Sequence, residues 1–232
     1  MSAPEIVAVG AGIVASLWIL SSAVRTMVIP RDERVFLTDL AFELARRASR
    51  WRANRHDDRP RRHRILGTFA PVVLVSLPLI WAVGLIASFA AIHWGLDAGS
   101  VGDALELSGS SLTTLGFVAA PNSATRYAAI VEALLGLAIV ALMISFLPTI
   151  YTTFSRREIA VARLTTRAGE PPSALEFLTR LHRIERLDGV GDRWDEWESW
   201  FEELGETHTT FPALVYFRST SWGRSWLTAA ET

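Results

Sequence analysis

Residues 100–121 read S-V-G-D-A-L-E-L-S-G-S-S-L-T-T-L-G-F-V-A-A-P, and this stretch decides how the whole chain is interpreted. Ser100, with Asp103 three residues later, predicts a helix N-cap followed by an acid in the first turn. A helix over 101–112 has about a dozen residues, whereas a membrane-spanning helix needs about 20 apolar ones. The hydroxyl-rich run 110–114 then leads into Gly116, a pattern that an ordinary extracellular loop leaves unexplained.

On both sides of this stretch, the charged residues are distributed unevenly along the chain. Half of the 232 residues are hydrophobic, but only seven of the 47 Asp, Glu and Arg residues fall within 1–30 and 65–155. No charge occurs over 65–96, and such an uncharged run of 32 residues is typical of a membrane segment. We therefore predict an all-α membrane protein with spans within 6–24, 65–94 and 127–154.

The Arg-rich segment 31–64 predicts the orientation of these spans. It holds eleven Arg against six acidic residues, and the positive-inside rule places such a short loop in the cytoplasm. The chain is then a multi-pass protein of the inner (plasma) membrane, with its N-terminus outside and its C-terminus in the cytoplasm. Residues 34–52 fit an amphipathic helix. We expect anionic lipid, rather than nucleic acid, to contact the basic residues Arg46, Arg47, Arg50, Arg61 and Arg62.

Between the second and third predicted spans, nine residues match a known sequence motif in their identity and order. They are Asp103-Ala104-Leu105, Ser108, Leu112-Thr113-Thr114, Gly116 and Pro121. This order resembles the pore module of the potassium channel superfamily, with its approximate pattern D-A-L-x-x-S-x-x-x-L-T-T-V-G-Y-G-D-x-x-P. The resemblance covers about 65–158, and the following span is similar to the inner helix of bacterial two-helix channels.

The resemblance implies an outer helix over 65–95, a pore helix over 101–112, a selectivity filter over 113–118 and an inner helix over 127–154. An extra transmembrane helix (1–30) and the cytoplasmic linker (31–64) precede this module (65–155), and a helical cytoplasmic domain (156–232) follows it. The family conducts potassium as a homotetramer, without a cofactor, a metal beyond the permeant ion, or enzymatic activity. Filter carbonyls replace the water around the cation. The implied filter residues are Thr113, Thr114, Leu115, Gly116, Phe117 and Val118.

The filter sequence T-T-L-G-F-V-A departs from the family pattern at its outer end. Val118 stands at the usual second glycine and Ala119 at the usual aspartate. A carboxylate pair behind the filter, found in many members, corresponds here to Ser110 and Ala119, neither of which ionises. Two alternatives to a potassium channel therefore stay open: a non-selective cation channel, and a non-conducting membrane sensor or scaffold built on a channel fold.

Three further residues are candidates for gating or for the outer vestibule. Glu132 either sets the potential of the vestibule or responds to pH, or it lies near the outer interface, where it snorkels or pairs with Arg126. Gly136 and Pro148 are either hinges for gating, as in the family, or ordinary residues of membrane helices.

An enzyme is a remote alternative, based on residues 6–15. Gly10, Gly12 and Ala15 fit the G-x-G-x-x-G/A fingerprint of a dinucleotide-binding oxidoreductase. The helix that would follow lacks a polar face, and no alternating strands and helices come after it. Close packing of Gly10 and Gly12 against another membrane helix explains both glycines better.

The tail reads as amphipathic helices without an identifiable ligand. Ser173 and Glu176 fit a capping box, and Gly189-Val190-Gly191 predicts a break between two helices. The next segment carries aromatic residues on one stripe, which favours a core or a subunit interface.

Overall fold

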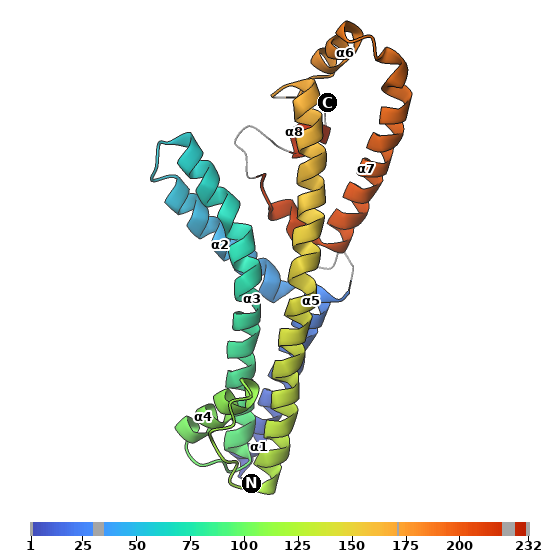
Figure 1. The fold of residues 1–232 in the computed structure, drawn as a ribbon. Coiled ribbons are helices and arrows are strands. Elements are labelled where there is room, and N and C mark those ends of the chain that lie inside the picture. The colour runs from blue at the N-terminus through green and yellow to red at the C-terminus, as the bar shows by residue number, and fades with distance from the viewer. Residues whose placement is uncertain (1, 30–34, 171, 220–225, 231–232) are drawn as a thin grey trace. The chain divides into compact units, whose positions relative to one another are not determined.

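The computed structural model describes residues 2–29, 35–170, 172–219 and 226–230, and every secondary-structure element within them is a helix. Three helices are long and apolar enough to cross a membrane (Figure 1): α1 (Ala3–Met27), α3 (Arg59–Gly95) and α5 (Ser123–Ala168). The expected class, an all-helical chain with three membrane-spanning candidates, is confirmed to this extent.

The chain divides into two compact units, which are described in turn. The first contains α1, the start of α2 (Phe36–Ala53) as far as Ala41, and residues 74–147 with α4 (Val101–Leu112). The second contains residues 42–73 and 148–232. Its further elements are α6 (Ala174–Arg183), the 3-10 helix η1 (Leu187–Gly189), α7 (Val190–Thr210), the 3-10 helix η2 (Pro212–Tyr216) and α8 (Trp226–Ala230).

All three long helices extend beyond their apolar segments. The 37 residues of α3 and the 46 of α5 measure about 55 and 69 Å at 1.5 Å per residue, well over a bilayer core of about 30 Å. Both helices are continuous, and Pro148 lies inside α5. Hydrophobicity marks only the part of a helix that lipid covers, so the sequence underestimated both lengths.

The sequence misplaced two features of the tail. The hydroxyl of Ser173 makes no capping bond. The backbone N–H of Ser173 donates to the carbonyl of Ala168 (2.9 Å), and the carboxylate of Glu176 accepts a hydrogen bond from Arg180. The expected break at 189–191 lies earlier, since α7 already begins at Val190. A single glycine in a helix costs only about 1 kcal/mol, and Gly191 is tolerated inside α7.

In the first unit, α1 packs antiparallel to α3 through small residues. The buried face of α1 consists of Gly12, Ser16, Ile19, Ser22 and Ala23. A Cβ added at Gly12 would lie 2.6 Å from the backbone oxygen of Ser88, and one at Gly95 would lie 2.6 Å from that of Glu5. Gly10 has nothing within 4 Å. The helix-packing interpretation is therefore confirmed for Gly12 and wrong for Gly10.

These contacts also bear on the dinucleotide fingerprint. Residues 6–15 lie entirely within α1. A dinucleotide site places its glycines in the turn between a strand and a helix, and no such turn exists at these residues.

In the second unit, Tyr216 and Phe217 join three helices. The Tyr216 ring stacks on Phe42 of α2, at 4.8 Å between centroids, and meets Phe69 of α3 edge-on at 6.1 Å. The Phe217 ring contacts Phe154 of α5 at 5.3 Å. Aromatic pairs at such distances stabilise a core beyond the area they bury. Tyr216 and Phe217 thereby pack on the Arg-rich linker, on α3 and on α5.

Arg157 of α5 is a buried anchor for the same segment and is only 5% exposed. Its guanidinium donates hydrogen bonds to the carbonyl oxygens of Leu214 (3.1 Å) and Phe217 (2.7 Å). Nη1 also lies 3.4 Å from Nε2 of His208, whose Nδ1 donates to the carbonyl of Leu204 (2.8 Å). His208 is therefore neutral in this arrangement, with its proton on Nδ1.

The packing of α1 predicts opposite effects at its two glycines. Gly12→Ala should destabilise the chain by about 1–3 kcal/mol, because overpacking forces backbone to move. Gly10→Ala should be neutral or stabilise by up to about 1 kcal/mol, through helix propensity alone. Thermal unfolding in detergent micelles measures both, and equal behaviour of the two variants would contradict the packing described for α1 and α3.

The surroundings of His208 predict a loss of stability in mild acid. Burial lowers the pKa of His208 below its ordinary value of 6.5, and the charge on Arg157 lowers it further. The unfolded chain then binds more protons below about pH 6.5, so stability falls as the pH drops through the pKa of the folded protein. Melting curves from about pH 8 to about pH 5 should show a smaller fall for His208→Gln than for the wild type. Identical slopes would contradict this role of His208.

Candidate functional site

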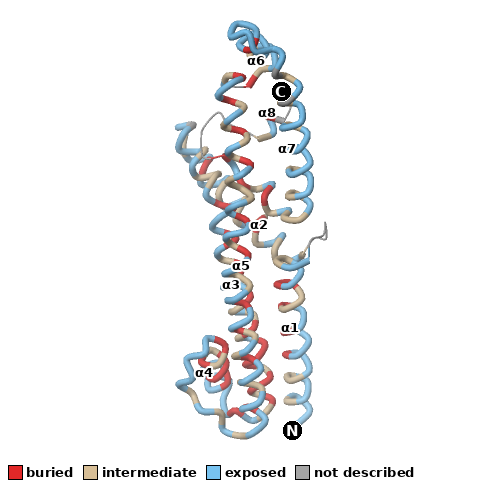
Figure 2. The backbone as a smooth tube through the Cα atoms, turned by 45° about the vertical axis from the view of Figure 1, so that its right-hand side comes forward, coloured by how far each residue is buried: buried red, intermediate tan, exposed pale blue. Residues whose placement is uncertain are grey.

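The candidate site begins with α4, whose start and length agree with the sequence. Ser100 and Asp103 form a reciprocal capping box: the backbone N–H of Asp103 donates to Ser100 Oγ (3.2 Å), and that of Ser100 donates to Asp103 Oδ2 (2.8 Å). Hydrogen bonds from Ser100 also lower the pKa of Asp103. Figure 2 shows α4 buried on one side and exposed on the other. The buried residues are Ala104, Leu107, Ser108, Ser110 and Leu112.

The loop after α4, residues 113–118, folds back on the end of that helix through its amides. The N–H groups of Thr113 and Thr114 donate to the carbonyl oxygens of Gly109 (3.2 Å) and Ser111 (2.9 Å). Those of Leu115 and Gly116 both donate to the carbonyl of Ser110, at 3.0 and 3.2 Å. These bonds satisfy helix-terminal carbonyls that otherwise lack a partner.

The carbonyl groups of the same loop are left unpaired. Among the described residues, none donates a hydrogen bond to a backbone oxygen of 113–118. Thr114 has a φ of 57° and Gly116 a φ of 70°, while the residues between and beside them stay at negative φ. Alternation of this kind turns successive N–H groups toward one side. The loop therefore bonds its amides to the end of α4 and leaves its carbonyl oxygens without a donor among the described residues.

The backbone of Thr114 is strained in this loop. A left-handed conformation is uncommon outside glycine and is a genuine outlier for a β-branched residue. It costs about 1–2 kcal/mol. Gly116 adopts the same region without that cost. Strained backbone of this kind is concentrated at functional sites, where surrounding bonds hold it in place.

Val118 and Ser110 show how the departures from the family pattern are accommodated. The N–H of Val118 donates to the buried hydroxyl of Ser110 at 3.2 Å. The side chain of Val118 packs on an apolar cluster formed by Ala90, Ala98, Ala104 and Leu107. A hydroxyl thus supports the loop at the position where a carboxylate was absent from the sequence, and the valine is an apolar anchor.

In the first unit, α3, α4 and α5 meet at the side chains of His93, Ser108 and Glu132, which we call the buried triad. All three have no exposed surface. The Ser108 hydroxyl lies 2.9 Å from the carbonyl oxygen of Ile86 and within hydrogen-bond distance of Glu132 Oε1, and His93 Nε2 lies 3.0 Å from Glu132 Oε2. Glu132 therefore contacts His93 and Ser108 and not Arg126, the partner that one interpretation of the sequence gave it. It is buried and does not face a vestibule within this chain.

Donor counting in the buried triad fits a neutral carboxyl group. Ser108 has one hydroxyl hydrogen for two acceptors, so both contacts are satisfied together only if Glu132 carries a proton. His93 then donates through Nε2, and its Nδ1, which has no partner among the described residues, is an unpaired acceptor and carries no hydrogen. A charged pair would instead bury an unsatisfied Nδ1–H donor, which is costly.

The remaining candidates, Gly136 and Pro148, lie within the unbroken α5. Gly136 is buried, and a Cβ added there would overlap the carbonyl oxygen of Leu112, the last residue of α4. The glycine thus has a packing role: it lets the end of α4 touch α5. Pro148 is exposed, and a hinge at either residue stays a prediction.

Several residues that build this site had no role in the interpretation of the sequence. His93 and Ser108 belong to the buried triad. Asn122 caps α5, since its Oδ1 accepts from the N–H of Thr125 (2.9 Å), and its side-chain amide donates to the carbonyl of Leu96 (2.8 Å). One signal for His93 was available: a histidine and an acid in otherwise uncharged spans are natural partners.

No family model, no curated protein and no solved structure matches this chain. Within the described part of the chain, no group of three or more His, Asp and Glu is placed to hold a metal ion. The function is therefore inferred from the residues and their geometry alone.

The buried triad predicts that an amide can replace the carboxyl group of Glu132. Glu132→Gln should unfold close to the wild-type temperature, because its NH2 can donate to Ser108 and its oxygen can accept from His93. Glu132→Ala should lose about 2–4 kcal/mol, through a cavity and unsatisfied partners. Thermal unfolding in detergent compares the two. Equal losses would contradict a neutral triad and favour an ion pair with His93.

Proposed function

We propose that the chain is one subunit of a homotetrameric cation channel that conducts potassium through the backbone carbonyls of residues 113–118. The observation that carries this proposal is the loop itself, in which five amides are bonded toward α4 while the carbonyl oxygens accept no hydrogen bond from a described residue. A dehydrated cation needs such oxygen ligands in place of water. The hydroxyl of Thr114 would add the innermost ligands.

The length and end of α4 support the same function. With 12 residues, α4 is about 18 Å long, so it enters the apolar layer without crossing it. The C-terminus of a helix carries a partial negative charge, which favours a cation nearby. Non-helical backbone at membrane depth is tolerated only where protein or a water-filled cavity covers it.

Four copies around an axis would complete the site. One chain supplies only one side of an ion-coordinating ring, and closed rotational symmetry is the usual way to supply the others. Leu115 and Phe117 are 70% and 68% exposed in the single chain. Such large apolar side chains beside a polar backbone call for cover by neighbouring subunits or lipid.

The Arg-rich linker supports a cytoplasmic position for the second unit and an external N-terminus. Arg46 and Arg47 are already paired with Glu43, at 2.5 and 2.7 Å, and their hydrogen bonds lower the pKa of that carboxyl group. In the described part of the chain, Arg50, Arg61 and Arg62 are exposed and make no ion pair. Of the five arginines expected at anionic lipid, these three are the better candidates.

Non-selective cation conduction is a second candidate, favoured by Val118. Its side chain is anchored in the apolar cluster and its φ is not positive, so the outer end of the loop lacks a glycine-like left-handed residue. One fewer well-formed carbonyl ring would weaken discrimination between potassium and sodium.

Ion flux into proteoliposomes tests the proposal. The wild type should take up potassium, and Gly116→Ala should reduce the flux at least about tenfold, because four subunits would each force alanine into a left-handed conformation costing about 1–2 kcal/mol. Gly67→Ala is the matched control, since Gly67 is helical with nothing within 4 Å of an added Cβ. A similar sodium flux would favour the non-selective channel.

Two results would contradict the proposal. Undiminished flux in Gly116→Ala would show that ions do not pass along residues 113–118. Intact four-fold particles with no flux would favour a non-conducting sensor or scaffold.

A further inference from the structure

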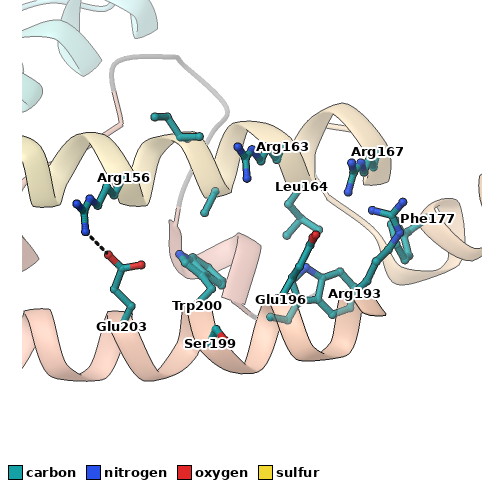
Figure 3. A pocket seen from close by; sticks show the side chains of 13 residues that line it. Arg156, Arg163, Leu164, Arg167, Phe177, Arg193, Glu196, Ser199, Trp200 and Glu203 are labelled. Carbon is teal, nitrogen blue, oxygen red and sulfur yellow. Dashed lines mark ion pairs between the residues drawn. The ribbon is translucent and has the colours of Figure 1, made fainter. Parts of the chain in front are cut away.

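The second unit holds a cavity of about 680 Å³ between the last part of α5 and α7. Its wall combines charge with aromatic surface, because Phe177, Trp197 and Trp200 line it together with four arginines. Figure 3 shows Arg163 and Arg167 directed from α5 toward α7, with Arg193 rising from α7. Pockets for small ligands commonly combine an apolar lining with a few convergent polar groups.

The charges in this cavity do not cancel. Its lining has four arginines and two carboxylates, and one of these carboxylates, Glu203, lies 3.7 Å from Arg156. No ion pair from Arg163, Arg167 or Arg193 to another described residue is found within 4.0 Å. The Nε atom of Arg193 is buried and has no hydrogen-bond acceptor within the described residues. A buried donor of this kind is costly unless something outside the chain accepts from it.

A second cavity, of about 360 Å³, adjoins the first and is more basic. The two share Arg167, Phe177 and Arg193, and the second adds Arg180, Arg183 and Arg186. No carboxylate lines the second cavity, but Arg180 is already paired with Glu176 at 2.5 Å. Arg167, Arg180 and Arg183 lie in the last turns of α5 and α6, where the helix dipole favours a cation. The dipole does not explain Arg193, which is the fourth residue of α7, near its N-terminus.

Phosphate is the anion that this arrangement fits best. Guanidinium groups bind phosphate oxygens through two parallel N–H donors, which makes arginine the usual choice for planar recognition of this group. The aromatic side of the cavity offers a flat apolar surface to a ring. A nucleotide combines both features in one molecule.

The position of Arg163 and Arg167 along α5 favours a water-soluble ligand over a lipid headgroup. The apolar part of α5 ends at Phe154, and Arg163 and Arg167 follow nine and 13 residues later. At 1.5 Å per residue they lie about 14 and 20 Å farther along the helix. The headgroup layer on each side of a bilayer is only about 5–8 Å thick.

We propose that the cavity between α5 and α7 binds a soluble phosphorylated ligand with an aromatic ring, of the nucleotide class. Arg163, Arg167 and Arg193 hold the phosphates, and Trp197 and Trp200 contact the ring. This site is independent of the proposed channel function, because binding to it can be measured on protein that passes no ions.

Equilibrium dialysis of the full chain with ATP tests the site, in nanodiscs made only of zwitterionic lipid. The double variant Arg163→Gln/Arg193→Gln should weaken ATP binding at least about tenfold, and Arg163→Gln alone should weaken it measurably without affecting folding, since Arg163 is exposed. Arg218→Gln, at an exposed arginine outside both cavities, should bind like the wild type. Pyrophosphate and adenosine should each bind more weakly than ATP.

Three outcomes would overturn the proposal. The first is no saturable binding of ATP to the wild type. The second is unchanged affinity in both Arg163→Gln and the double variant. The third is binding of phosphatidic acid vesicles through Arg163 and Arg193 in the absence of ATP binding, which would assign the cavity to lipid.

Discussion

The buried triad of His93, Ser108 and Glu132 is the contact on which the first unit depends. Each side chain comes from a different helix, and all three have no exposed surface, so the packing of α3, α4 and α5 is fixed by polar bonds that must all be satisfied. Partly satisfied polar networks in an apolar interior are worse than none, which makes such a cluster highly specific. Glu132 also lies one turn before Gly136, where the end of α4 touches α5. The triad therefore sets the position of α4, and α4 sets that of the loop 113–118.

The loop in turn depends on the end of α4. Five of its amides bond to the last turns of that helix or to the hydroxyl of Ser110. Those bonds hold Thr114 in a conformation that costs free energy by itself, and they leave the carbonyl oxygens free. The proposed ion site is thus a consequence of how a short capped helix ends, supported from behind by residues that no ion would touch.

Much of this could be predicted from the sequence, for identifiable physical reasons. Charge distribution revealed the three apolar spans, and Ser100 with Asp103 located α4, because both signals are local. Helix ends outside the apolar layer were missed, since hydropathy reports only lipid contact. The roles of His93, Ser108 and Arg157 were missed as well, because the partners described above lie 22 to 60 residues away in the sequence. In α1, Gly12 was predicted correctly and Gly10 was not, as helical register alone decides which glycine faces α3.

We have proposed that residues 113–118 of four chains surround an axial ion path. A density map of the full-length protein, reconstituted in nanodiscs with potassium, tests this arrangement. We expect a four-fold particle with a row of separate densities on the axis, each level with a ring of carbonyl oxygens from the loop. Particles without a four-fold axis, or a loop that lies away from the axis, would contradict it.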